Sequence, residues 1–281
     1  MNCVPELLEY EMGHGVRAFS TTRRGGYSVG PYAGFNINHY CGDDEAAIAK
    51  NRQALCSMLG ITDDRLIMPH QVHLTKLLRI DEAFLALQEE ERLQLLEGID
   101  AVMTDVPGVC IGVSTADCIP LLLYDEEHQA ICAVHAGWRG TVARITEKAV
   151  AAMKTTYGTR PEKLRAQIGP GISLESFEVG NEVYEAFSQA GFDMNAISKR
   201  PEIKDSPLTS HPSPLTTHLL PLTSKWHIDL PECNRLQLIS AGVAEHHIAL
   251  SHICTYQQCD TYFSARRLGI NSGRIYTGIL L

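Results

Sequence analysis

Three apolar runs follow one another in the middle of the chain: Val109–Thr115 (VCIGVST), Ile119–Tyr124 (IPLLLY) and Ala130–His135 (AICAVH). Their apolar residues are continuous rather than alternating, which is typical of strands covered on both faces. The polar stretch 125–128 between the last two runs suits a hairpin connection. The runs therefore predict the buried centre of a β-sheet.

Helices and further strands surround this centre. A glycine within two residues ends each predicted helix, and the helices span residues 43–59, 82–96, 141–157, 181–190 and 231–241. Other predicted strands span 16–19, 164–169, 226–230, 248–252 and 274–281. The two kinds of element do not alternate regularly, and no GxGxxG motif occurs. The pattern therefore favours an α+β fold with a mixed sheet over a doubly wound nucleotide fold.

No shift in composition marks a second domain, so residues 1–281 are predicted to form a single domain. Residues 204–224 are rich in serine, threonine, proline and leucine, and repeat Pro-Leu-Thr three times. This low complexity predicts an exposed loop or insertion within the domain.

Composition narrows the classes of function. A formal net charge of −9 argues against a general binder of nucleic acid, which needs clustered lysine and arginine. No apolar run is long enough to span a membrane, and residues 1–6 lack the basic and apolar pattern of a secretion signal, so none is expected. Nine cysteines, an odd number without framework spacing, predict free thiols in a reducing compartment, hence the cytoplasm. The sequence allows a homo-oligomer without requiring one.

Two neighbouring runs carry side chains with metal-binding chemistry. Cys118 directly precedes the second run and His135 ends the third, so a hairpin would place them side by side. His73, after another short apolar run, is a third candidate. Two imidazoles and one thiolate would make an open zinc site with a fourth position for water or substrate. From the residues alone, core packing of each side chain is favoured over a ligand role, and a Cys118–His135 nucleophile pair is a second functional alternative.

Several neighbours of these residues are further candidates. Asp117 suits a turn, a proton carrier or a partner of a metal ligand. The stretch 137–140 (GWRG), with Arg139, opens a predicted helix, where an anion could bind. Arg266-Arg267 and Arg274 could complete a basic pocket, although adjacent surface arginines are usually only solvated charges.

Short motifs occur along most of the chain in the order of one known family. Each is weak alone, but their number and order are specific. They are residues 20–28 (STTRRGGYS), 36–38 (NIN), 51–52 (NR), 71–73 (QVH), 115–118 (TADC), 134–140 (VHAGWRG), 168–172 (IGPGI), 177–180 (FEVG), 229–230 (DL), 234–235 (NR), 254–255 (CT), 263–267 (FSARR) and 273–274 (GR). Together they resemble the YfiH-like family, long labelled multicopper polyphenol oxidase or laccase and now described as zinc-containing purine nucleoside phosphorylases.

The resemblance implies a fold, an activity and a ligand set. The fold is an α+β sandwich of mixed β-sheets flanked by helices, also likened to cysteine-dependent toxin deamidases. The implied activities are phosphorolysis of adenosine, inosine, guanosine and S-methyl-5′-thioadenosine, and deamination of adenosine. The substrates are thus purine nucleosides and phosphate. One Zn²⁺ would be held by His73, Cys118 and His135.

Motif position suggests roles for other residues. Arg139 and Arg23 are candidates to hold the anion, Asp117 and Asn36 to handle protons or contact the ribose, and Arg266 to contact substrate. The Pro-Leu-Thr stretch around 207–224 has no recognised counterpart in the family pattern.

Three rival functions remain open. A zinc-free hydrolase or deamidase would use only Cys118 and His135. A copper-dependent polyphenol oxidase is the second, but twelve histidines without a single HxH pair fit it poorly. The third is a non-catalytic module that a metal stabilises.

Overall fold

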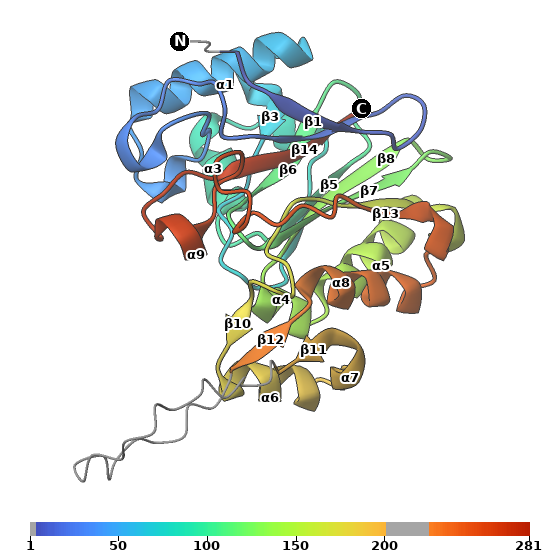
Figure 1. The fold of residues 1–281 in the computed structure, drawn as a ribbon. Helices are drawn as coiled ribbons and strands as arrows, with labels where there is room; N and C mark the ends of the chain where they lie inside the picture. The colour runs from blue at the N-terminus through green and yellow to red at the C-terminus, as the bar shows by residue number, and fades with distance from the viewer. Residues whose placement is uncertain (1–3, 201–224) are drawn as a thin grey trace, which may run out of the picture.

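The protein is described by a computed structural model covering residues 4–200 and 225–281. The predicted insertion at 204–224 lies outside these residues. Figure 1 shows four layers from top to bottom: helix α1 (Glu45–Leu59), a five-stranded sheet, a six-stranded sheet, and the helices α5 (Ile145–Tyr157) and α8 (Leu230–Ser240). The fold is thus the predicted α+β sandwich of mixed sheets flanked by helices.

The six-stranded sheet contains two of the three apolar runs at its centre. Its strands lie in the order β13-β9-β7-β8-β5-β4. Their bounds are Ile248–Leu250, Arg165–Ile168, Ile119–Asp125, Ala130–Ala136, Ala101–Thr104 and Leu77–Arg79. β7 and β8 form the predicted antiparallel hairpin, while β13–β9 and β4–β5 are parallel pairs, so the sheet is mixed.

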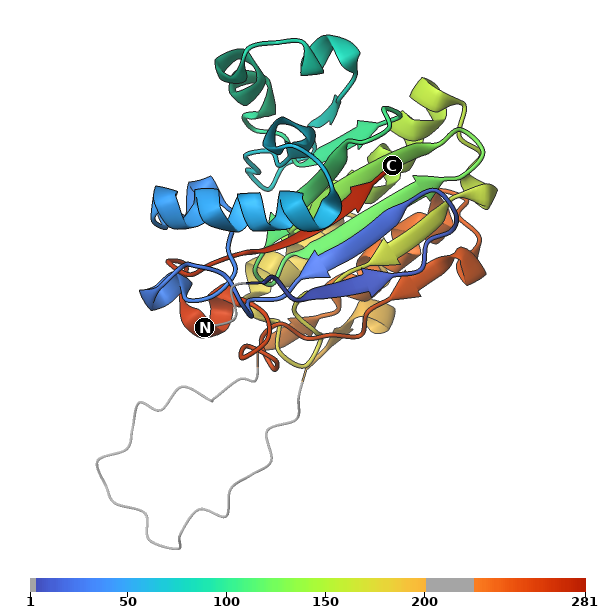
Figure 2. The ribbon, with the colours of Figure 1, turned by 90° about the horizontal axis from the view of Figure 1, so that it is seen from above.

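The five-stranded sheet contains the remaining run. Its order is β1-β2-β14-β6-β3, with bounds Leu7–Tyr10, Arg17–Thr21, Ile275–Leu280, Cys110–Thr115 and Leu66–Ile67. The last strand of the chain, β14, lies between β2 and β6 (Figure 2). This placement ties the C-terminal residues to the centre of the molecule.

Both faces of the central strands are buried, as continuous apolarity predicts. Leu122 and Tyr124 of β7 pack between the two sheets with Ile111 and Val113 of β6. The alternate residues of β7 and β8 face α5 and α8. The outer face of the five-stranded sheet packs against Leu55 and its neighbours on α1. Burial on both faces leaves functional side chains only at the strand ends.

A small three-stranded sheet lies below the sandwich. It contains β10 (Glu178–Val179), β12 (Trp226–Ile228) and β11 (Ser198–Lys199), in that order, beside α6 (Asn181–Gln189) and α7 (Met194–Ile197). α9 (Ala265–Leu268) precedes β14. In the described part of the chain, no helix has both the length and the apolar character to cross a membrane.

Two predicted helices are wrong in extent. The segment 82–96 forms two helices, α2 (Glu82–Leu85) and α3 (Glu89–Leu96), because Gln88 is extended and caps the second. The segment 141–157 also divides. Helix α4 (Trp138–Val142) ends at Ala143, and Arg144 takes a left-handed φ of 63° before α5 begins. The Arg144 guanidinium stabilises this break by donating to the Ala190 carbonyl at 2.6 Å.

Candidate metal centre

The β7–β8 hairpin brings Cys118 and His135 together. Pro120 pairs with His135 and Ile119 with Ala136, so Cys118 lies beside the end of β8. Asp117, the residue before Cys118, has a φ of 90°, a conformation uncommon outside glycine. This sharp turn allows the chain to leave the end of β6 and enter β7.

His73 arrives on a loop after β3. The Gln71 side chain holds this loop against the end of β6, because its amide donates to the Ser114 carbonyl and accepts from the Ser114 N–H, both at 2.8 Å. His73 itself has a left-handed φ of 64°. The double hydrogen bond and the unusual backbone turn the His73 side chain back toward the hairpin.

A fully buried carboxylate connects the two histidines. Asp100, 0% exposed, accepts from His135 Nδ1 at 2.8 Å, from the His73 N–H at 2.9 Å and from the Leu74 N–H at 2.8 Å. Burial alone would raise the pKa of Asp100, but these hydrogen bonds outweigh burial and lower it. Sequence reasoning missed Asp100. The available signal was an acid between Ile99 and Ala101 at the start of an apolar run, where a charge needs partners.

The three predicted ligands converge. The donor atoms of His73, Cys118 and His135 all lie within 4.8 Å of one another, and this is the one such group among residues 4–200 and 225–281. The two imidazole rings meet edge to face at 4.8 Å between centroids. The distances and the chemistry of the donors suit a single metal ion with three protein ligands.

The electrostatics favour the thiolate. Burial would raise the pKa of Cys118, but His135 and then His73 outweigh it and lower the pKa to about 6. Burial would lower the pKa of His135, but Cys118 and Asp100 raise it to about 9. A thiolate is the form of cysteine that binds a metal or attacks an electrophile. The group therefore suits metal binding and nucleophilic chemistry alike.

Gly137 closes the back of the group. A Cβ at this position would lie 2.9 Å from His73 Cδ2, 3.1 Å from Cys118 Sγ and 3.7 Å from His135 Cε1. Its φ of −68° and ψ of 167° are open to any residue, so space rather than conformation requires glycine here.

We expect Gly137→Ala to displace the ligands and lower the affinity for a metal ion such as Zn²⁺ by about tenfold or more, because ligand geometry tolerates little displacement. The backbone accepts alanine, so the melting temperature of the metal-free protein should stay within a few degrees. Zinc titration against a competing chelator and thermal unfolding measure the two effects. Unchanged zinc affinity in a folded variant would contradict the role of Gly137.

A cavity of about 290 Å³ opens beside the three ligands. It lies between the loop of His73, the β6–β7 connection and the start of β14. The residues that line it with the ligands are Asn38, Tyr40, Cys41, Pro69, His70, Gln71, Ser114, Thr115, Ala116, Ala265, Ile270 and Arg274. One edge is aromatic, because Tyr40 stacks on His70 at 4.1 Å.

Asp117 and Arg266 do not line this cavity, but their hydrogen bonds hold together segments that surround it. The Asp117 carboxylate accepts from the Thr255 hydroxyl and from the Arg266 backbone N–H, both at 2.7 Å. The Arg266 guanidinium is exposed and donates to the Glu178 carbonyl. These contacts favour the turn-forming role of Asp117 among the three that the sequence left open.

The other predicted residues also lie outside the lining. Arg139 is exposed and stacks over Trp138 at 4.3 Å. Arg23 donates to the carbonyls of Cys259 and Ala33. The buried Asn36 amide bonds Asp43, and its oxygen accepts from the Arg274 N–H. These side chains therefore contact neighbouring loops and helices instead of the cavity. Among the described residues, the arginine that lines the cavity is Arg274.

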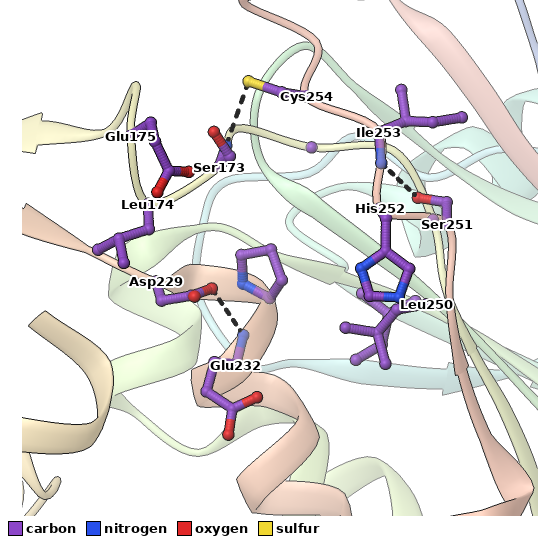
Figure 3. A pocket seen from close by; sticks show the side chains of 14 residues that line it. Ser173, Leu174, Glu175, Asp229, Glu232, Leu250, Ser251, His252, Ile253 and Cys254 are labelled. Atoms are coloured by element: carbon purple, nitrogen blue, oxygen red, sulfur yellow. Dashed lines mark hydrogen bonds between the residues drawn. The ribbon is translucent and has the colours of Figure 1, made fainter.

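A second cavity, of about 340 Å³, lies between the start of α8 and the end of β13 (Figure 3). It is lined by Glu175, Asp229 and Glu232, and no lysine or arginine of the described residues lines it. Asp229 accepts from the Glu232 N–H at 3.0 Å, and Cys254 Sγ accepts from the Ser173 N–H at 3.4 Å. This acidic cavity does not suit an anion.

Known proteins resemble the chain over nearly its whole length. A purine nucleoside phosphorylase of Bacteroides thetaiotaomicron is 46% identical over 263 residues, which cover 94% of this chain and 90% of that protein. Adenosine deaminase RL5, from an unknown prokaryotic organism, is 42% identical over 265 residues, 94% of each. The crystal structure of YlmD from Geobacillus stearothermophilus superposes with a TM-score of 0.79 at 29% identity, covering 95% of this chain and 92% of YlmD.

A family model also covers most of the chain, residues 17–281, and is described as multi-copper polyphenol oxidoreductase laccase. The crystal structure of the hypothetical protein YfiH from Bacillus licheniformis shares the fold, with a TM-score of 0.82 over 99% of this chain and 97% of its own at 24% identity. The predicted resemblance is confirmed: the chain belongs to the YfiH-like family of laccase-type proteins.

Proposed function

We propose that the protein is a zinc-dependent purine nucleoside phosphorylase that also deaminates adenosine. The observation that carries the proposal is the convergence of His73, Cys118 and His135 beside a cavity. The names of the relatives support the same two activities. The cavity is close to the lower end of the range of about 300–1,000 Å³ that is usual for small-molecule sites.

The donor set supports zinc. Two imidazoles and a thiolate are preferred zinc ligands, and catalytic zinc sites keep three protein ligands. Bound there, zinc supplies Lewis acidity, which lowers the pKa of a bound water and polarises a substrate oxygen. A multicopper oxidase needs several histidine-rich copper sites, and the described residues contain one cluster.

The chain itself orients these ligands. A carboxylate only accepts hydrogen bonds, so His135 Nδ1 carries the proton and Nε2 is left to bind the metal. The Asp100 hydrogen bonds fix the backbone of the His73 loop in the same way. The His135 imidazole and the backbone that carries His73 are therefore positioned before any metal or substrate binds.

Two reactions would share the site. In phosphorolysis a phosphate oxygen bonds to the ribose C1′ while the C1′–N9 bond breaks, and its electron pair leaves with the base, which takes up a proton. In deamination a water oxygen bonds to C6 of adenine and ammonia leaves. The first reaction needs phosphate and the second does not, so phosphate separates them experimentally.

The test is to incubate zinc-loaded protein with adenosine, inosine, guanosine and S-methyl-5′-thioadenosine, with and without phosphate, and to identify products by mass spectrometry. We expect free bases and ribose 1-phosphates only with phosphate, and inosine from adenosine without it. Stoichiometric copper with faster oxidation of phenols than cleavage of inosine would show an oxidase instead.

Removal of the metal should abolish both reactions. After dialysis against a chelator we expect a folded protein with no activity, because the ligands lie at the edge of the sandwich and outside its core. Zinc should restore activity, and circular dichroism monitors the fold. A protein that unfolds without metal and neither binds nor converts nucleosides would be a metal-stabilised interaction module.

The cellular setting is part of the proposal. All eight cysteines among the described residues are free thiols, which supports a reducing compartment and hence the cytoplasm.

A further inference from the structure

Phosphorolysis needs a cationic group that holds phosphate beside the metal, and the chain carries a formal net charge of −9. Among the described residues that line the metal cavity, Arg274 is the single lysine or arginine. The arginines that motif position suggested, Arg23, Arg139 and Arg266, do not line it. Arg274 is therefore the cation best placed to attract an anion into this cavity.

Backbone carbonyls orient the Arg274 guanidinium, and these neutral partners do not neutralise its charge. Its Nη1 donates to the carbonyls of Ser272 and Gly273, and Nη2 donates to that of Ile270 at 3.0 Å. No carboxylate pairs with it among residues 4–200 and 225–281, whereas Arg17, Arg52 and others form ion pairs. Nε and one N–H of Nη2 have no acceptor within the described parts of the chain. An oriented, uncompensated guanidinium of this kind is suited to an oxyanion.

A buried hydroxyl lies near this arginine. Thr115 is 1% exposed and forms part of the wall of the same cavity, and its Oγ1 has no hydrogen-bond partner in the described part of the structure. Thr115 pairs with Ile275 across β6 and β14, so Arg274 and Thr115 lie at the same edge of the sheet. A buried hydroxyl without a partner is unfavourable, and a bound ligand would satisfy it.

We propose that Arg274 and Thr115 form the phosphate subsite of the metal cavity, with the guanidinium and the hydroxyl each donating to phosphate oxygens. The inference rests on the proposed function. It places the anion three residues along the chain from Cys118, at the end of β6, while the nucleoside occupies the remainder of the cavity. The acidic cavity in Figure 3 offers no comparable cation.

The first test is Arg274→Gln. We expect the KM for phosphate in inosine phosphorolysis to rise about 10- to 100-fold, the usual effect of losing a charged hydrogen bond. The loss in phosphorolysis should exceed the loss in phosphate-independent adenosine deamination at least about tenfold. Arg160→Gln is the matched control. It removes one positive charge from an exposed ion pair with Glu127, outside the cavity, and should leave both reactions unchanged.

The second variant, Thr115→Val, keeps the size of the side chain and leaves the 270–274 loop intact. We expect a rise of about 3- to 10-fold in the KM for phosphate, reversed in Thr115→Ser, which restores the hydroxyl. Phosphate binding can also be measured without catalysis, from its effect on the melting temperature. Added phosphate should raise the melting temperature of the wild type and of Arg160→Gln, but not that of Arg274→Gln.

Two results would overturn the subsite: an unchanged KM for phosphate in folded Arg274→Gln and Thr115→Val, or an equal loss of phosphorolysis and deamination. A wild-type protein that catalyses neither reaction would overturn the proposed function instead. Stabilisation by phosphate would then still test the subsite by itself.

Discussion

His73→Ala is expected to abolish zinc binding and to lower both phosphorolysis and deamination by about 10³-fold or more, because Lewis acidity contributes several kcal/mol to such reactions. With two ligands left, a tetrahedral zinc site loses its geometry. The fold should survive, since the His73 side chain is exposed and its backbone N–H still donates to Asp100. Metal analysis of the purified variant and initial rates with each nucleoside measure the effect.

His73→Ala also distinguishes a zinc-dependent mechanism from that of a zinc-free cysteine hydrolase. A Cys118–His135 nucleophile pair does not need His73, so a hydrolase would keep most of its activity without metal. The matched control is His14→Ala, which removes an exposed imidazole from a loop outside the metal group. A metal-free His73→Ala that reacts within tenfold of the wild-type rate would refute the zinc mechanism.

The centre of the fold could be predicted from the sequence because a buried strand is recognisable from its own residues, without knowledge of its contacts. Strands β7 and β8 are covered on both faces, so their apolar runs are continuous and their turn is polar. The hairpin register follows from the short connection, and it places Cys118 beside His135. The position of His73 did not follow in this way, since only the motif order suggested that its loop reaches the hairpin.

The rest of the site depends on contacts between distant segments. The sequence could not show which of Arg23, Arg139, Arg266 and Arg274 lines the cavity, because each lies in or beside a segment that contains glycine or serine. The pairing of β14 with β6 is what brings Arg274 to the cavity. The roles of the first three arginines and the single-domain organisation stay predictions.

The sequence also did not predict where α4 ends and α5 begins. The break between α4 and α5 depends on Arg144, whose guanidinium bonds the Ala190 carbonyl 46 residues later. Helical periodicity continues across such a break, so the pattern 141–157 predicted one helix. A tertiary contact decided the boundary.

Asp100→Asn is expected to lower zinc affinity about 10- to 100-fold, the usual range for a carboxylate that orients a metal-binding histidine. The asparagine keeps the size of the side chain but loses its charge, and its NH₂ group would face one of the N–H donors. Asp100 accepts from His135 Nδ1 and from the backbone N–H groups of His73 and Leu74, so one exchange loosens the His135 imidazole and the loop that carries His73. The metal-free variant should also unfold about 1–3 kcal/mol more easily, because a buried donor loses its acceptor.

Zinc competition with a chromophoric chelator and urea unfolding in excess chelator measure these two effects separately. Asp105→Asn is the matched control, because it removes a carboxylate from a surface ion pair with Arg79, just beyond the strand that Asp100 precedes. Such a pair contributes about 0–1 kcal/mol, so its loss should change neither zinc affinity nor stability by much. If Asp100→Asn bound zinc within threefold of the wild type, the imidazoles would be oriented by the surrounding packing alone, and Asp100 would have no positioning role.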